Sequence, residues 1–93
     1  MAVVLVDGEN VRRSLWPNLA HDELERRAEA WGEREGHDVQ VVWEPADDRI
    51  AATAQELAAG GTAVWVGTSD RGLKARIPDA ERILGGGTFA RTV

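Results

Sequence analysis

Three short segments of this chain are rich in β-branched apolar residues, and each has the length of a strand. They are 2–6 (AVVLV), 38–43 (DVQVVW) and 62–67 (TAVWVG). The first is continuously apolar, which is typical of a strand that is covered on both faces. Between them, 21–36 and 46–61 carry apolar residues at helical spacing, which predicts two amphipathic helices.

Shorter elements complete the predicted order. We expect helices over 11–15 and 69–77, with Pro17 ending the first, and a fourth strand over 82–84. The glycine run 85–88 lacks the lysine and the following helix of a phosphate-binding loop. It is therefore predicted to be a tight turn that lets the backbone approach its neighbours closely and then leads into a short tail.

Strands that alternate with helices predict an α/β fold with parallel strands. With right-handed crossovers we expect a central parallel sheet of about four strands in the order 2-1-3-4, flanked by helices in a three-layer, Rossmann-like arrangement. No linker or repeat interrupts the sequence, so a single domain over 1–93 is expected. The second strand would be an exposed edge beside a small core, which predicts self-association to a homo-oligomer through that edge.

Composition narrows the function classes. The chain has no run of the ~20 apolar residues that cross a bilayer, and its start lacks the basic region of a signal peptide. We therefore expect a cytoplasmic protein without a membrane partner. The absence of cysteine excludes disulfides and thiolate metal sites. The net charge of −5 argues against a broad nucleic-acid surface, although 71–93 is locally basic.

Acidic residues follow three of the predicted strands. Asp7 ends the first strand, and Asp70 follows the third. Glu44 ends the second strand, and Asp47 and Asp48 open the helix after it. Because the carboxyl ends of parallel strands meet at one edge, where such sheets bind ligands, these side chains are expected to converge. Local interpretations are also open: Asp47 could be a helix N-cap, Asp70 a first-turn acid favoured by the helix dipole, and Asp7 a turn residue before Gly8.

Converging carboxylates repel one another unless a cation neutralises them. Oxygen ligands without a cysteine or a histidine cluster favour Mg²⁺ or Mn²⁺, and such sites commonly serve phosphate chemistry. We predict that Asp7, Asp47, Asp48 and Asp70 bind the metal. Asn10, one helical turn after Asp7, either starts a helix or orients an acid, a bound water or a phosphate.

Candidate substrate contacts flank these acids in the sequence. A phosphate backbone would be held by basic side chains and by one hydroxyl, which are Arg12, Arg13, Ser69, Arg71 and Lys74. Ser69 also has a local interpretation as a helix cap.

Four motifs of the chain resemble, in this order, those of the NYN domains in the PIN-like nuclease superfamily, particularly the bacterial YacP-like branch. They are LVDGENV (5–11), ADDRI (46–50), VGTSDRGLKARI (66–77) and GGGTFAR (85–91). The match covers nearly the whole length. The resemblance implies a Rossmann-like PIN fold, a divalent-metal site of acidic residues and phosphodiester cleavage of RNA.

Carried over by position, the resemblance implies site acids at Asp7, with Asn10 beside it, at Asp47, with Asp48 adjacent, and at Asp70. The chain departs from the family after the second strand. The family usually has Phe-Asp-Gly, a loop and an extra strand there, whereas this chain compresses the region and has Glu44 in place of the aspartate. We therefore expect four strands instead of five, weak affinity for RNA and broad sequence tolerance.

The residues and the resemblance together predict a Mg²⁺- or Mn²⁺-dependent endoribonuclease that acts on single-stranded RNA. The main alternative is a PIN-like module that binds RNA or a protein and cleaves nothing. A mononucleotide-binding, flavodoxin-like domain is disfavoured, because no glycine-rich turn opens the first helix. Metal-dependent turnover of RNA separates the first two, and nucleotide binding without metal would support the third.

Overall fold

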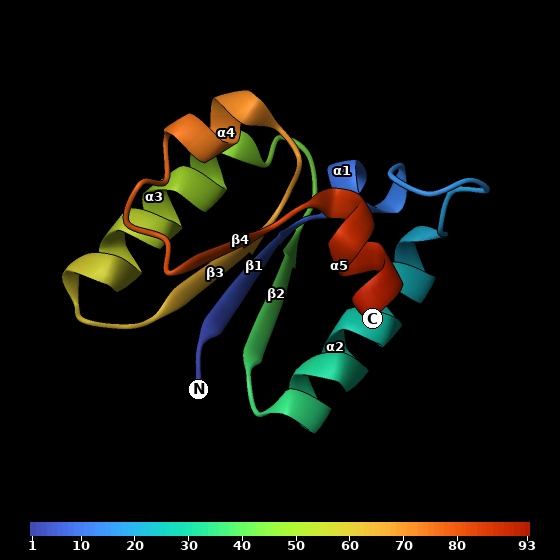
Figure 1. Ribbon diagram of the computed structural model, residues 1–93, viewed down its shortest axis with the longest axis horizontal. Coiled ribbons are helices and arrows are strands. Elements are labelled where there is room, and N and C mark those ends of the chain that lie inside the picture. Colours follow the sequence, from blue (N-terminus) through green and yellow to red (C-terminus); the bar gives the residue numbers. More distant parts are fainter.

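Four parallel strands form the centre of the computed structural model, which describes residues 1–93 (Figure 1). Their order across the sheet is β2-β1-β3-β4, and every pairing is parallel. The predicted fold class and strand order are confirmed. Along the chain the elements are β1 (Val3–Asp7), α1 (Gly8–Arg12), α2 (His21–Glu35), β2 (Asp38–Val42), α3 (Asp47–Ala59), β3 (Val64–Gly67), α4 (Arg71–Ala75), β4 (Arg82–Leu84) and α5 (Gly86–Thr92).

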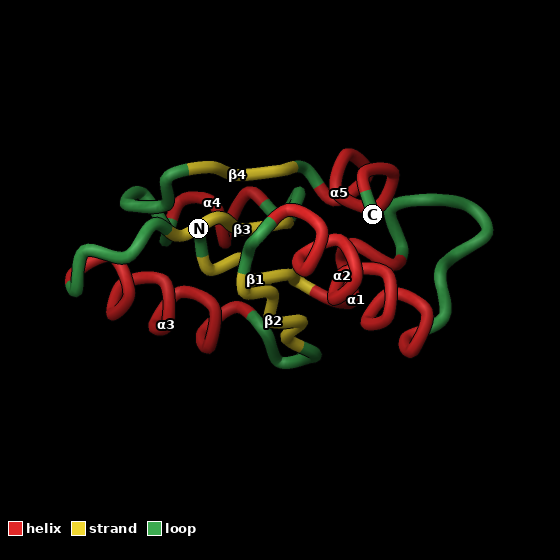
Figure 2. Tube along the Cα trace, turned by 90° about the horizontal axis from the view of Figure 1, so that it is seen from below, coloured by secondary structure: helices red, strands yellow, loops and turns green.

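Helices cover both faces of this sheet. Side chains of β1 alternate between the faces, so that Val4 and Val6 pack in a core cluster with α1, α2 and α5, whereas Val3 and Leu5 pack in a second cluster with α3 and α4. Figure 2 shows the same division, with α3 and α4 on one side of the strands and the other helices opposite. Burial on both faces explains why β1 is continuously apolar up to Asp7.

The chain passes from β1 into α1 without a loop, because Gly8 follows Asp7 directly as the first helical residue. The indole ring of Trp43 packs against Gly8, and a Cβ at position 8 would stand 2.6 Å from a ring atom. Glycine is therefore required for this close approach. Two boundaries differ from the predicted ones. Helix α1 begins at Gly8 and not at residue 11, and β2 ends at Val42, so Trp43 lies just past it.

The prediction of a tight turn and a tail at the C-terminal end is wrong, because α5 forms there (Figure 1). Phe89 is fully buried and Ala90 nearly so, both in the cluster with α1 and α2. The Phe89 ring meets Trp31 edge-on, with the ring centroids 5.4 Å apart. Glycine has low helix propensity, so the local sequence does not favour this helix. The burial of its apolar face against the sheet and α2 stabilises α5 instead.

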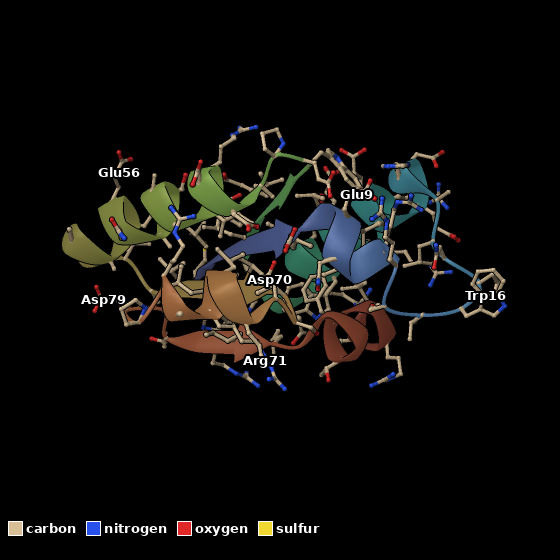
Figure 3. The ribbon with its side chains drawn as sticks, turned by 90° about the horizontal axis from the view of Figure 1, so that it is seen from above. Glu9, Trp16, Glu56, Asp70, Arg71 and Asp79 are labelled. Atoms are coloured by element: carbon tan, nitrogen blue, oxygen red, sulfur yellow. The ribbon has the colours of Figure 1, made fainter.

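The parallel strands direct their carboxyl ends to one edge of the sheet, which Figure 3 views from above. The segments that follow β1, β2 and β3 meet at this edge, and they carry the predicted acids. The outer strands are β2 and β4, as predicted for β2. None of the helices combines the length and the apolar character that crossing a membrane requires.

Candidate functional site

A polar cleft of about 470 Å³ lies at the carboxyl edge of the sheet. Ala46 is the single hydrophobic residue of its wall. Four of the five acids predicted to converge share this cleft, and three of them are predicted metal ligands. Its full lining consists of Asp7, Glu9, Asn10, Arg13, Ser14, Glu44, Ala46, Asp47, Ser69 and Asp70.

Thr68 links the two acids that follow β1 and β3. Its hydroxyl is fully buried, donates to Oδ2 of Asp7 at 2.9 Å and accepts from the backbone N–H of Asp70 at 3.1 Å. Asp7 is 5% exposed, and no fully buried side-chain polar atom lacks a partner. Because Oδ1 of Asp7 makes no hydrogen bond to the protein, this oxygen must reach the cleft.

Burial raises the pKa of the Asp7 carboxyl above its ordinary value. The hydrogen bond from Thr68 acts in the opposite direction, and the negative charges of Asp47, Asp70 and Glu44 raise the pKa further. The net effect is an increase. Asp7 thus lies where an additional positive charge would be most favourable.

Asp70 has a structural role beside its place in the cleft. It is the N-cap of α4, where its Oδ1 accepts from the backbone N–H groups of Gly72 at 2.8 Å and Leu73 at 3.2 Å. Its Oδ2 makes no hydrogen bond to the protein. The local interpretations are thus exchanged: Asp70 is a helix N-cap and not a first-turn acid, whereas Asp47 lies in the first turn of α3 after the N-cap Ala46. One carboxylate oxygen of Asp70 remains available to a ligand.

The two consecutive aspartates at the start of α3 point to different places. Asp47 lines the cleft with Glu44, whereas Asp48 lies outside it. The Asp48 side chain is 89% exposed and forms an ion pair with Arg76 at 2.8 Å. Successive helical residues project in directions about 100° apart, so only one of the pair can face the cleft. The structure therefore does not bring Asp48 to the other predicted metal ligands.

Asn10 connects three segments around the cleft. Its Oδ1 accepts from the backbone N–H of Ser69 at 2.9 Å, and Oγ of Ser69 accepts from the backbone N–H of Gly86 at 2.7 Å. A Cβ at Gly86 would stand 2.7 Å from Oδ1 of Asn10. The close backbone approach predicted for the glycine run is found here, and it orders α1 and α5 around the loop before α4.

Glu9, two residues after Asp7, is the centre of a second group of charged side chains. Its carboxylate meets Arg12 at 3.1 Å, Arg13 at 3.0 Å and His21 at 2.6 Å. Burial alone would raise the pKa of Glu9, but the hydrogen bonds from Arg12 and His21 and the positive charges of Arg12 and Arg13 together lower it. This group was not predicted from the sequence, although Arg12 and Arg13 lie three and four residues after Glu9, a spacing that predicts ion pairs on a helix.

The predicted substrate cations are not equally placed. Arg13 lines the cleft with a side chain that is 58% exposed, so it can reach a ligand while paired with Glu9. Arg12 is 20% exposed and also donates to the carbonyl of Leu19, which leaves it little freedom. Arg71 and Lys74 do not line the cleft, and Figure 3 shows Arg71 on the β4 side of Asp70.

The acids of the cleft suit a hard divalent cation by their chemistry. Asp7, Asp47 and Asp70 present carboxylate oxygens, and the cleft contains no cysteine or histidine. No three acidic or histidine side chains form a complete metal-binding group, however. Mg²⁺ usually keeps several waters and binds through one or two carboxylates plus substrate phosphate, so an incomplete protein ligand set is compatible with it.

No family model, curated protein or solved structure matches this chain. The resemblance to NYN domains therefore remains a hypothesis, and the cleft is the structural basis for the proposed function.

Proposed function

We propose that this protein is a Mg²⁺- or Mn²⁺-dependent endoribonuclease of the NYN/PIN-like type. The observation that carries the proposal is the environment of Asp7. This carboxylate is buried, is held by Thr68, and shares a cleft with Asp47, Asp70 and Glu44 at the ligand-binding edge of a parallel sheet. Such a concentration of negative charge is unfavourable by itself and becomes favourable with a divalent cation.

Asp7 would hold the metal together with Asp47 or Asp70, and the remaining acid would act through a metal-bound water. When bound, the metal would lower the pKa of a water molecule and stabilise charge on the phosphoryl oxygens. Thr68 keeps Asp7 and the backbone of Asp70 in a fixed relation, since its hydroxyl bonds both. Asn10 would act as a positioning residue, because its amide oxygen accepts from the backbone N–H of Ser69 in the loop before α4.

The wall of the cleft supports a substrate held by its phosphates. Arg13 supplies a cation to the wall of the cleft, and its ion pair with Glu9 uses only part of the guanidinium. With Ala46 as its only apolar residue, the cleft has no aromatic ring on which a base could stack. We therefore expect phosphate contacts to dominate base contacts within the cleft, which gives broad sequence tolerance.

A second candidate is a module that binds RNA without cleaving it. Two observations favour it: no complete metal-binding group is assembled, and one oxygen of Asp70 is committed to capping α4. A binding module would retain the cations and the cleft but show no metal-dependent turnover.

The test is cleavage of an unstructured RNA by the purified protein with Mn²⁺ or Mg²⁺, with and without EDTA. Asp70→Asn should lower the rate by about 100-fold or more, because a ligand of the charge-stabilising metal is weakened. Asparagine also caps helices well, so α4 should persist. Asp48→Asn is the matched control, and its rate should equal that of the wild type. Cleavage that persists in EDTA, or cleavage that Asp70→Asn leaves unchanged, would refute the proposed metal-dependent nuclease.

A further inference from the structure

Trp16 differs from the other tryptophans in having no packing partner. Its side chain is 90% exposed, whereas Trp31 is buried and Trp43 and Trp65 are partly buried. Each of those three stacks on or tilts against a histidine or phenylalanine ring, and Trp16 meets no aromatic ring. Figure 3 shows its indole at the outer end of the loop between α1 and α2.

The loop that carries Trp16 is fixed at its base. Arg12 and Leu19 exchange two hydrogen bonds, from Leu19 N–H to the Arg12 carbonyl at 3.1 Å and from the Arg12 guanidinium to the Leu19 carbonyl at 3.3 Å. Leu15 and Leu19 pack against the core on either side of the exposed residues 16–18. The indole is therefore held outward by its neighbours, which limits the conformational entropy that a ligand must restrict.

The loop is continuous with the cleft. Arg13 and Ser14 line the cleft, and Trp16 follows two residues later. An RNA that leaves the cleft past Arg13 and Ser14 and follows this segment outward would reach the loop. The cleft itself has no ring for a base, so an aromatic side chain along that path would supply what the cleft lacks.

We propose that the Trp16 indole stacks on one unpaired base of a single-stranded RNA whose backbone lies in the cleft. This inference rests on the proposed function. Base–aromatic stacking tolerates any base, because every base presents a flat π face. It therefore adds affinity without adding sequence specificity.

The surroundings of Trp16 favour a base over a protein or a membrane. The only other large hydrophobic residues that are exposed are Met1, which precedes β1 at the opposite edge of the sheet, and Ile83 on β4. Protein and membrane interfaces need a contiguous apolar patch, and a solitary indole is not one. A single exposed ring, three residues along the chain from the arginine of the cleft, matches a single base.

The test is equilibrium binding of the full chain to an eight-nucleotide RNA in Ca²⁺, an oxygen-binding divalent cation that can neutralise the acids of the cleft, with gels to show that the RNA stays intact. Trp16→Ala should weaken binding by about fivefold to 100-fold, the range seen when a stacking residue is truncated. Trp16→Phe should restore part of the loss. Asn18→Ala, on the same exposed loop, is the matched control and should bind like the wild type, and melting curves should show that all variants fold.

An RNA of the same length without bases separates stacking from other causes. The wild type should bind it less tightly than the normal RNA by about the factor that Trp16→Ala loses, and Trp16→Ala should bind the two nearly equally. RNA should also quench wild-type fluorescence more than that of Trp16→Phe, since the other tryptophans are shielded.

Several outcomes would overturn the inference. If the wild type binds RNA and Trp16→Ala binds it equally, the stacking site does not exist while the proposed function stands. If Trp16→Ala still discriminates against the abasic RNA as the wild type does, Trp16 acts otherwise than by stacking. Adsorption to lipid vesicles that Trp16→Ala abolishes without a change in RNA affinity would assign the indole to a membrane. If the wild type binds no RNA, the proposed function fails together with this inference.

Discussion

Asp7 and Glu9 are two residues apart in the chain, yet their surroundings are opposite. Asp7 lies among other acids, and its pKa is raised by burial and by their charges. Glu9 is surrounded by Arg12, Arg13 and His21, and its pKa is lowered. The Asp7 carboxylate has only acidic neighbours among the charged groups that shift its pKa, whereas the Glu9 carboxylate has two arginines and a histidine around it.

The difference shows which acid is available for a ligand. Glu9 is neutralised by groups of the protein itself, so it contributes to holding α1, the following loop and the start of α2 together. Asp7 has no basic partner in the protein, so a cation beside it would relieve the unfavourable charge that raises its pKa. The glycine and the asparagine beside them fit the same division: Gly8 makes room for Trp43, and Asn10 orders the loop before α4.

The largest expected effect is that of Asp7→Asn on metal binding and cleavage. Loss of the central carboxylate should lower the cleavage rate by about 100-fold or more and abolish the heat of Mn²⁺ binding in a calorimetric titration. Without metal, the same variant should be more stable by on the order of 1 kcal/mol, because it removes an unfavourable buried charge. A metal-free variant less stable than the wild type in urea would contradict this view of Asp7.

The next effect is a loss of stability in Glu9→Gln. This substitution weakens the charge-assisted hydrogen bonds from Arg12 and His21 and removes the ion pair with Arg13, so the free energy of unfolding should fall by about 1–2 kcal/mol at neutral pH. Glu23→Gln is the control, because Glu23 makes only an exposed i, i+4 pair with Arg27 and should lose less than about 0.5 kcal/mol. Equal losses in the two variants would show that the group around Glu9 is not special.

The pH dependence of these two effects sharpens the comparison. A raised pKa in the folded state makes Asp7 increasingly unfavourable as pH rises through that pKa, so the gain from Asp7→Asn should vanish in acid, below the ordinary Asp value. A lowered pKa makes Glu9 stabilising above the ordinary Glu value, and that stability is lost as pH falls through the folded pKa. Urea unfolding between about pH 3 and pH 7 should therefore show both variants converging on the wild type from opposite sides. Two curves that stay parallel over this range would refute the assignment.

The smallest effect concerns the cations. Arg13→Ala should weaken RNA binding severalfold and reduce the slope of log affinity against log salt by about 0.7 to 1, the value of one phosphate contact. Arg71→Ala tests whether RNA also lies along the β4 side of Asp70. If it does, this variant should show a similar decrease in the salt dependence of binding. An unchanged slope in Arg13→Ala would remove the one cation that lines the cleft from the binding surface.

Much of this architecture could be predicted from the sequence because it depends on local pattern and on general rules for parallel sheets. The apolar run of β1 and the alternation of strands and helices led to the observed strand order. The rule that strand ends share an edge placed Asp7, Asp47 and Asp70 in one cleft. These conclusions need no knowledge of individual side-chain contacts.

The remaining features depend on tertiary contacts that the pattern does not encode. Glycines at 85–87 argued against a helix, yet burial of Phe89 against Trp31 stabilises α5. Asp47 and Asp48 look equivalent in the sequence, but the helical rotation turns one to the cleft and the other to Arg76. The outward position of Trp16 likewise depends on how Leu15 and Leu19 anchor the loop.

The proposed nuclease activity requires a divalent cation at the acids of the cleft. A crystal of the protein soaked in Mn²⁺ and measured at the manganese absorption edge tests this requirement. We expect an anomalous peak in the cleft, about 2.0–2.4 Å from a carboxylate oxygen of Asp7 and from one of Asp47 or Asp70. A saturating soak that leaves the cleft without a peak, or that places manganese only on acids elsewhere, would show that the cleft is not a metal site.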